Sequence, residues 1–376
     1  MRPNVFEIDL GAVAHNVQSL RRRVGKHVRL FAALKANAYG FGLLPVADAV
    51  LSAGADGLAL VDLNHAIALR KHGTDSPILL YGGTPASPEV VALLEEHRLM
   101  PTLLDLEDAR TYARYASGHL RAFLKIDVGL ERMGVSPEDL GAIAEPLGSL
   151  PTLELYGAYT HLHVPANVDD ALTQRYVAWQ FRRFTTGLDE LSQHGINPTI
   201  TMAASSAVLM QTNDMNLNAV DPGHLLFGMV PAGPRGAPLD LRPAFHALKS
   251  RLVQVKTLRR ADFVDKAPFL IHDGMRIGVF PLGIADGMLQ LNCGQVLVNG
   301  VRVPVLGVSL EHTRVELSTV EAVRGDEVVV IGRQAGNEIC QEEVLQHLRQ
   351  HIPSALPLAV HESVRRTYVD GNVRDA

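Results

Sequence analysis

Short apolar runs rich in valine, leucine, isoleucine and alanine recur through the first two thirds of the chain, and longer amphipathic segments separate them. Continuous apolar runs are typical of strands buried on both faces, whereas the amphipathic segments have the periodicity of helices. Strand and helix are therefore expected to alternate. The predicted strands are Leu30 to Lys35, Gly57 to Val61, Ile78 to Tyr81, Pro101 to Leu104, Ala122 to Asp127, Leu155 to His161, Thr199 to Ala203 and Ala219 to Asp221.

This alternation predicts an α/β fold with a parallel sheet. Eight strand and helix units fit a closed (β/α)8 barrel of the TIM type, and an open doubly wound sheet is the structural alternative. We place the barrel domain over residues 1–242.

The pattern changes near Pro243, where the amphipathic segments end. The strands predicted beyond it are Leu252 to Leu258, Arg276 to Leu282, Val296 to Leu306, Arg314 to Leu317 and Val328 to Ile331. Asn299-Gly300 is a strong hairpin signal, because both residues tolerate the positive φ angles of a tight turn. We therefore expect a C-terminal all-β domain over residues 243–376.

Composition narrows the possible partners. The chain has 376 residues, 20% of them charged, and a net charge of −5, with basic residues scattered along it, so neither nucleic acid nor membrane is an expected partner. The two cysteines, Cys293 and Cys340, form no close pair, which predicts no disulfide framework and no metal site. The first residues lack the pattern of a secretion signal, so we expect a cytoplasmic location.

The active site of a β/α barrel lies where the strands end. Lys35 follows the first predicted strand, and burial there would lower the pKa of its amine, as a Schiff-base nucleophile needs. A solvated or salt-bridged lysine is the alternative. Ser205, Ser206, Gly223 and His224 follow the seventh and eighth strands, where they would form either a phosphate cradle or ordinary turns.

Charged and polar residues also end the fifth and sixth predicted strands. Lys125, Asp127 and Arg132 belong to the fifth, and Thr160-His161 ends the sixth. Charged groups in apolar strands need partners, so these residues take part in chemistry or pair with one another inside the barrel.

Together these residues resemble the alanine racemase family of pyridoxal phosphate enzymes, which combine a barrel with a β domain. The most specific match is Leu34-Lys35-Ala36-Asn37-Ala38-Tyr39-Gly40, which is similar to the cofactor-lysine signature of that family. The order and spacing of further motifs agree: Lys125-Ile126-Asp127 with Gly129 and Arg132, Thr160-His161, Ser206, Pro222-Gly223, and Gly283 with Ala285-Asp286-Gly287.

The resemblance implies roles for individual residues. Lys35 would form the Schiff base with pyridoxal 5'-phosphate, and His161 would pack against the pyridine ring. Arg132 would approach the substrate carboxylate, and Lys125 matches a position that is often carbamylated to orient that arginine. The phosphate would be held by Tyr39, Ser206, Gly223 and His224.

Several positions depart from the family pattern, among them Glu362 and Leu310-Glu311-His312, and two others bear directly on the chemistry. Ile284 in Gly283-Ile284-Ala285-Asp286-Gly287 stands where the family has a tyrosine of the partner subunit that serves the second face of the α-carbon. Losing a positioned acid–base group typically costs about 10² to 10⁴ in rate. Asp221 stands where the family places an arginine opposite the pyridine nitrogen, and a carboxylate there favours the protonated ring.

Other residues of the β domain are candidates for the missing base: Glu311, His312, His361 and Glu362, with His224 of the barrel. Three functions follow. The chain is an amino-acid racemase or epimerase, it is an enzyme of aldol cleavage, decarboxylation or amino transfer that uses Lys35 and Asp221, or it binds pyridoxal phosphate without catalysis. The resemblance also implies a homodimer with shared active sites and a small amino-acid substrate.

Overall fold

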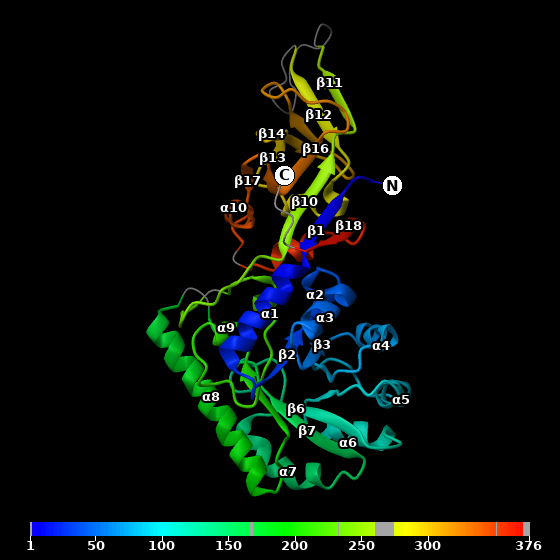
Figure 1. Ribbon diagram of the computed structural model, residues 1–376. Helices are drawn as coiled ribbons and strands as arrows, with labels where there is room; N and C mark the ends of the chain where they lie inside the picture. The colour runs from blue at the N-terminus through cyan, green and yellow to red at the C-terminus, as the bar shows by residue number, and fades with distance from the viewer. Residues whose placement is uncertain (1, 166–167, 232, 260–273, 351, 371–376) are drawn as a thin grey trace. The chain divides into compact units, whose positions relative to one another are not determined.

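The computed structural model describes residues 2–165, 168–231, 233–259, 274–350 and 352–370. The chain divides into two compact units (Figure 1). One is Ala12–Arg242, and the other combines Met1–Gly11 with Pro243–Ala376.

The first unit is a parallel barrel. Its strands are hydrogen bonded in the order β4-β3-β2-β9-β8-β7-β6-β5. A parallel bridge between Leu79 and Met100 joins the two edges, which confirms the predicted barrel and excludes the open sheet. The strands are β2 (Arg29–Ala33), β3 (Gly57–Leu60), β4 (Ile78–Leu80), β5 (Thr102–Leu103), β6 (Leu120–Lys125), β7 (Leu153–Tyr159), β8 (Ile200–Ala204) and β9 (Ala219–Val220).

Helices follow the barrel strands, and side-chain caps define where several begin. Asp62, Ser87, Asp105 and Asp169 each accept a hydrogen bond from a backbone N–H of the first turn. The helices of this unit are α1 (Leu10–Val24), α2 (Lys35–Tyr39), α3 (Leu43–Ser52), α4 (Leu63–His72), α5 (Pro88–Glu96), α6 (Leu106–Tyr115), α7 (Leu140–Gly148), α8 (Asp170–Gln193) and α9 (Ser206–Leu209), with the 3-10 turns η1 (Pro137–Asp139) and η2 (His224–Phe227).

Large apolar side chains fill the barrel interior. Phe31, Phe123, Met202 and Ile200 are buried in one cluster with Tyr159, and Tyr81 packs against it. This filled interior makes the barrel a rigid support for the side chains at its mouth.

The second unit is an antiparallel sheet with one parallel edge. Its order is β11-β12-β15-β14-β13-β16-β10-β1-β18, and β17 pairs with β16. The strands are β1 (Val5–Asp9), β10 (Phe245–Arg251), β11 (Gln254–Thr257), β12 (Arg276–Phe280), β13 (Gln295–Val298), β14 (Val301–Val308), β15 (Thr313–Glu316), β16 (Glu327–Gln334), β17 (Asn337–Ile339) and β18 (Arg365–Val369). Its short helical elements are η3 (Ile284–Asp286), η4 (Met288–Gln290), α10 (Gln341–His347) and α11 (Ala355–Ala359).

The start of the chain groups with this second unit. Strand β1 pairs with β10 on one side and with β18 on the other. The sequence analysis assigned residues 1–242 to the barrel, whereas this pairing puts Val5–Asp9 into the β sheet. The predicted hairpin is confirmed, since β13 and β14 pair across Asn299 and Gly300, which have φ of 50° and 76°.

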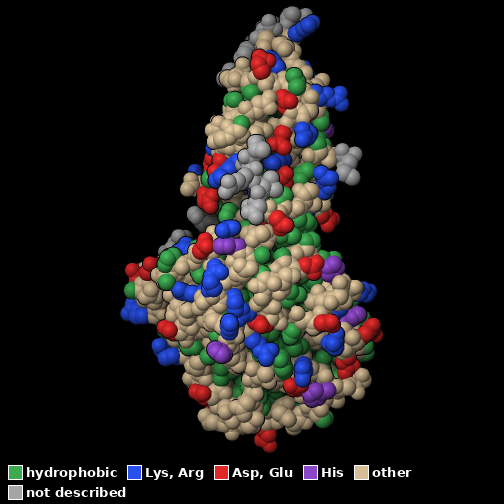
Figure 2. All heavy atoms as spheres, in the orientation of Figure 1, with side chains coloured by type: hydrophobic (Ala, Val, Ile, Leu, Met, Phe, Trp, Pro, Cys, Tyr) green, Lys and Arg blue, Asp and Glu red, His purple; other side chains and the backbone are tan. Residues whose placement is uncertain are grey.

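The surface shows no dominant charge on the face drawn in Figure 2, where lysine and arginine are interspersed with aspartate and glutamate. Within the described residues no helix is long and apolar enough to span a membrane.

Candidate active site at the mouth of the barrel

Chemically useful side chains gather where the parallel strands of the barrel end. Lys35 follows β2, Tyr81 follows β4, Lys125 ends β6 and Asp221 follows β9. Because the carboxyl ends of parallel strands open on the same face, these groups share one mouth. The fold therefore brings Lys35, Lys125 and Asp221, which the sequence analysis named, to one end of the barrel.

Lys35 opens an unusual left-handed turn. Ala36, Asn37, Ala38 and Tyr39 have φ of 52° to 54°, in the region that costs a non-glycine residue about 1–2 kcal/mol. The turn is held by the Asn37 side chain, whose oxygen accepts a hydrogen bond of 2.8 Å from the Leu43 N–H. Backbone strain of this kind persists where the surrounding structure fixes it, and it clusters at functional sites.

The surroundings of Lys35 change the proton affinity of its amine. The side chain reaches solvent at the mouth, yet the protein around it lowers its pKa by desolvation. Asp221 opposes this shift and Arg132 reinforces it. The amine lies 6.0 Å from the ring centres of Tyr39 and Tyr81. A lowered pKa raises the fraction of neutral amine that can attack a carbonyl group.

Lys35, Lys125, Arg132 and Asp221 form a set of interacting charges that we call the charged cluster. Burial lowers the pKa of Lys125 to about 7, and its amine lies 4.4 Å from the ring centre of Tyr159. Burial raises the pKa of Asp221 to about 6, although Tyr81, Lys125 and Lys35 all favour its charged form.

The two oxygens of Asp221 have different surroundings. Oδ2 accepts a hydrogen bond of 2.7 Å from the Tyr81 hydroxyl. Oδ1 is buried and has no hydrogen-bond partner. A buried carboxylate oxygen without a donor is costly, so this atom marks a place for a donor that the protein chain itself does not supply.

Asp127 builds the turn that carries Arg132. Its carboxylate accepts backbone N–H bonds from Gly129, Leu130, Glu131 and Arg132, at 2.8 to 3.2 Å. Desolvation raises the pKa of Asp127, but these four bonds outweigh it and the pKa is lowered. The exposed Arg132 side chain therefore extends from a backbone that is firmly held.

Tyr39, Ser206, Gly223 and His224 form a second group, which we call the neutral cluster. The Ser206 Oγ accepts hydrogen bonds from the N–H groups of Gly223, at 2.9 Å, and of Leu225, at 3.3 Å. The ring centres of Tyr39 and His224 are 5.2 Å apart. A Cβ atom at Gly223 would lie 2.2 Å from the Tyr39 hydroxyl, so only glycine fits there.

His161 is held neutral at the mouth. Burial, together with the nearby cations Lys125, Lys35 and Arg132, lowers its pKa to about 3. Thr160 has a structural task, because its hydroxyl donates to the Ile126 carbonyl at 2.7 Å and ties the end of β7 to that of β6.

These residues fit pyridoxal phosphate. Lys35 offers an amine for its aldehyde, and the unpaired Oδ1 of Asp221 suits a protonated ring nitrogen. The Tyr39 and Ser206 hydroxyls of the neutral cluster suit a phosphate, and neutral His161 suits an aromatic ring. The predicted cofactor and the donor set therefore agree.

Apart from His224, the candidates for a second base belong to the other unit. Ile284 lies in η3 with 43% of its side chain exposed, and Asp286 of the same turn is buried and bonds the Gly283 N–H at 2.9 Å. Glu311 forms an ion pair with Arg2. His312, His361 and Glu362 are exposed.

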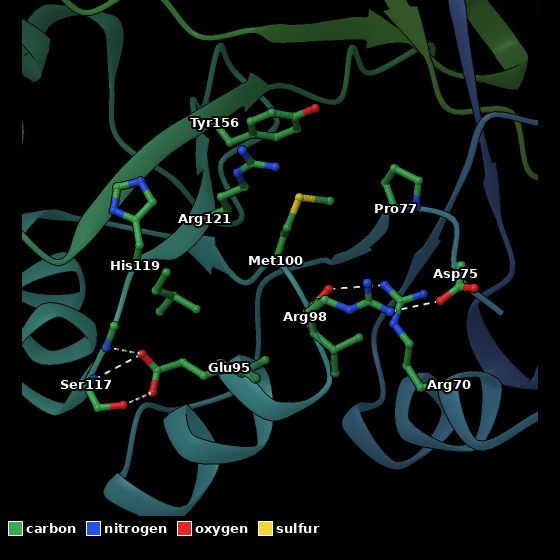
Figure 3. A pocket seen from close by; sticks show the side chains of 14 residues that line it. Arg70, Asp75, Pro77, Glu95, Arg98, Met100, Ser117, His119, Arg121 and Tyr156 are labelled. Carbon is green, nitrogen blue, oxygen red and sulfur yellow. Dashed lines mark hydrogen bonds and ion pairs between the residues drawn. The ribbon is translucent and has the colours of Figure 1, made fainter. Parts of the chain in front are cut away.

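A cavity of about 520 Å³ lies at the opposite end of the barrel (Figure 3). Its wall includes Pro77 and Met100, which precede β4 and β5. Arg98 pairs with Asp75 at 2.8 Å, and the Glu95 carboxylate accepts the Ser117 N–H at 3.0 Å. Arg98 and Asp75 thus pair within the wall, and this end of a barrel usually serves stability.

Sequence reasoning missed Tyr81 as a functional candidate, although it named the strand that ends there. The signal was present, since Tyr81 is a polar-tipped residue at the carboxyl end of a barrel strand. Its contact with Asp221 joins residues 140 positions apart, which no local pattern reveals.

Comparisons with known proteins cover both units. The family model described as "Alanine racemase, N-terminal domain" matches residues 8–231, and "Alanine racemase, C-terminal domain" matches residues 245–368. Alanine racemase 2 of Caldanaerobacter subterraneus is 32% identical over 98% of this chain and 95% of its own. Alanine racemase of Geobacillus kaustophilus is 37% identical over 92% and 90%.

Solved structures give the same result. The crystal structure of alanine racemase from Bacillus anthracis with bound L-Ala-P aligns with a TM-score of 0.87 at 28% identity, covering 99% of this chain and 96% of that one. Alanine racemase from Streptomyces coelicolor aligns with a TM-score of 0.83 at 29% identity, covering 98% of each chain.

Proposed function

The chain belongs to the alanine racemase family, and from that premise we propose that it is a pyridoxal phosphate enzyme that racemises or epimerises an amino acid at the α-carbon. The observation that carries the proposal is Lys35, a lysine of lowered pKa on a strained turn at the barrel mouth, in the electrostatic reach of a buried aspartate.

The neutral cluster would hold the phosphate of the cofactor, and Asp221 would bind its ring nitrogen through Oδ1. His161, neutral because burial lowers its pKa to about 3, would pack on the ring without adding a charge. When bound, pyridoxal phosphate supplies an electron sink for negative charge that develops at the α-carbon.

The other residues would bind the substrate and move its proton. Arg132 offers a guanidinium for the substrate carboxylate, and the Asp127 turn fixes its backbone. Lys35 would remove the α-proton on one face with its neutral amine and return it there. Lys125, whose pKa is lowered to about 7, has the neutral fraction that reaction with carbon dioxide requires.

We further propose that Ile284 and Asp221 replace the tyrosine and the arginine of the family. An isoleucine carries no proton, so racemisation needs another group on the second face, and Glu311, His312, His361, Glu362 and His224 are the candidates. The predicted homodimer would bring such a group from the partner subunit. The cytoplasmic location stays a prediction.

Asp221 supports a second candidate function. A carboxylate that keeps the ring nitrogen protonated strengthens the electron sink, which suits aldol cleavage, decarboxylation or amino transfer with Lys35 as the one base. A protein that binds the cofactor without catalysis is the third candidate, and turnover of any amino acid would exclude it.

Proton NMR in deuterium oxide, with chiral chromatography of the same samples, separates these functions. The holoenzyme is incubated with a panel of L- and D-amino acids. Deuterium at the α-position with inversion is the result expected for a racemase. Exchange with retention, or cleavage products, would instead establish one-base chemistry.

Lys35→Ala tests the covalent attachment. The variant should lose the absorbance of lysine-bound cofactor, and its retention would show that another residue forms the bond. Sedimentation of the holoenzyme tests the shared site, since a monomer that turns over substrate would contradict the proposed dimer.

A further inference from the structure

Tyr81 and Asp221 form a pair that the assigned roles leave unexplained. The Tyr81 hydroxyl donates to Oδ2 of Asp221 at 2.7 Å, and Asp221 is buried. The bond uses one carboxylate oxygen and leaves the other, Oδ1, buried without a partner. The hydroxyl therefore decides which oxygen of Asp221 is available to a bound group.

Contacts with neighbouring strands fix the position of Tyr81. Its ring centre lies 5.6 Å from that of Tyr159, and the Tyr159 hydroxyl is 3.1 Å from the Thr102 hydroxyl oxygen. Thr102 in turn donates to the Leu80 carbonyl at 2.7 Å, next to Tyr81 in the chain. This closed chain of contacts links β4, β5 and β7 and limits rotation of the Tyr81 ring.

We infer that Tyr81 is a positioning residue, which holds Asp221 by Oδ2 so that Oδ1 is the oxygen that receives the ring nitrogen of the cofactor. The inference rests on the proposed function, because it takes Asp221 as the partner of that nitrogen. Tyr81 would touch neither the substrate nor the reacting atoms and would act through Asp221.

The electrostatic surroundings of Tyr81 keep its hydroxyl protonated, so that it stays a hydrogen-bond donor. Burial and the charge of Asp221 raise the pKa of Tyr81 well above its usual value, so the hydroxyl keeps its proton. Lys125 and Lys35 also face Asp221 and favour its charged form. Of Tyr81, Lys125 and Lys35, Tyr81 alone makes a hydrogen bond to Asp221. A hydrogen bond depends on direction, so it can hold the carboxylate in one orientation, as a positioning residue must.

Tyr81→Phe removes the hydroxyl and keeps the ring that packs on Tyr159. We expect equilibrium dialysis of the holoenzyme to show cofactor binding weakened about tenfold, the effect of losing one hydrogen bond to a charged group. We also expect the acid transition in the absorbance of bound cofactor to move about one pH unit upward, because the carboxylate loses a donor that favoured its charged form.

Tyr112→Phe is the matched control. Its hydroxyl is also removed from a buried ring and also bonds at 2.6 Å, but to the Thr84 carbonyl rather than to Asp221. This variant should leave cofactor affinity within about twofold and the acid transition in place. Equal changes in both variants would show a general loss of stability and overturn the inference.

Asp221→Ala separates the inference from its premise. If Asp221 binds the ring nitrogen and Tyr81 acts through it, Asp221→Ala weakens cofactor binding, and adding Tyr81→Phe changes it no further. If Asp221→Ala changes cofactor affinity or absorbance and Tyr81→Phe changes neither, the positioning role of Tyr81 is overturned and the proposed role of Asp221 stands. No effect of Asp221→Ala on affinity or absorbance overturns the proposed role of Asp221, and the inference with it.

Discussion

The neutral cluster and the charged cluster share one barrel mouth but are built on different physics. The neutral cluster consists of hydroxyls and backbone N–H groups that are closely packed. The Tyr39 hydroxyl lies so near Gly223 that a Cβ atom at residue 223 would be 2.2 Å from it. The charged cluster uses buried ionisable groups that interact with each other, with the pKa of Lys125 lowered to about 7 and that of Asp221 raised to about 6.

This difference suggests that the two clusters have different functions. Neutral donors in a close-packed cradle would bind a phosphate in a way that changes little with pH. Buried charges respond to protonation, and they would tune proton transfer at the reacting atoms. The neutral cluster should therefore contribute to cofactor binding without setting the rate of the chemical step, whereas the charged cluster should affect both, because Lys35 and Asp221 would also hold the cofactor.

Asp221→Asn should have the largest effect and tests the charged cluster. The amide keeps the shape and an acceptor for Tyr81 but removes the negative charge. At saturating cofactor we expect the rate of α-proton exchange, measured by NMR, to fall about 10²-fold, as when one preorganised electrostatic group is lost. An unchanged rate would contradict this difference in function, because the charge would then have no part in the chemistry.

Gly223→Ala should come next and tests the neutral cluster. The added Cβ would lie 2.2 Å from the Tyr39 hydroxyl, and such overpacking costs about 1–3 kcal/mol. We expect cofactor affinity to fall accordingly in a titration followed by absorbance, while the rate per bound cofactor changes less than about twofold. Gly118→Ala is the control, since its nearest neighbour would be 3.5 Å away. A fall in the rate without a fall in cofactor affinity would contradict the role assigned to the neutral cluster.

The pH dependence of stability should give the smallest effect. Folding lowers the pKa of Lys125 from 10.5 to about 7, so between these values the unfolded chain binds a proton that the folded protein does not. The free energy of unfolding therefore falls as pH decreases from 10.5 to 7 and then levels off.

Lys125→Met should flatten this slope in cofactor-free protein kept free of carbon dioxide. We expect the thermal midpoint of the unmodified protein to rise between pH 7 and 10.5, and that of Lys125→Met to rise less. Lys71→Met, on the exposed side of α4, is the control and should keep the slope. A slope that survives in Lys125→Met would show that the titrating group lies elsewhere.

The barrel strands were predictable because each is a local apolar run, and all eight predicted segments hold a strand in the structure. Strands β1, β10, β17 and β18 were missed. The pairing of β1 and β10 with each other and with β18 and β16 depends on partners far along the chain. The left-handed turn after Lys35 was also hidden, because alanine, asparagine and tyrosine give no local signal for four successive positive φ angles.

The sequence by itself determined the alternation of strand and helix, the hairpin at Asn299-Gly300, and which polar residues end the strands. These features follow from local periodicity and turn chemistry, which neighbouring residues specify. Only the tertiary structure decided that Tyr81 donates to Asp221, that Oδ1 of Asp221 has no partner, and that the pKa of Lys125 is lowered to about 7. Burial and long-range contacts set these properties, and they exist only when distant strands close into one barrel.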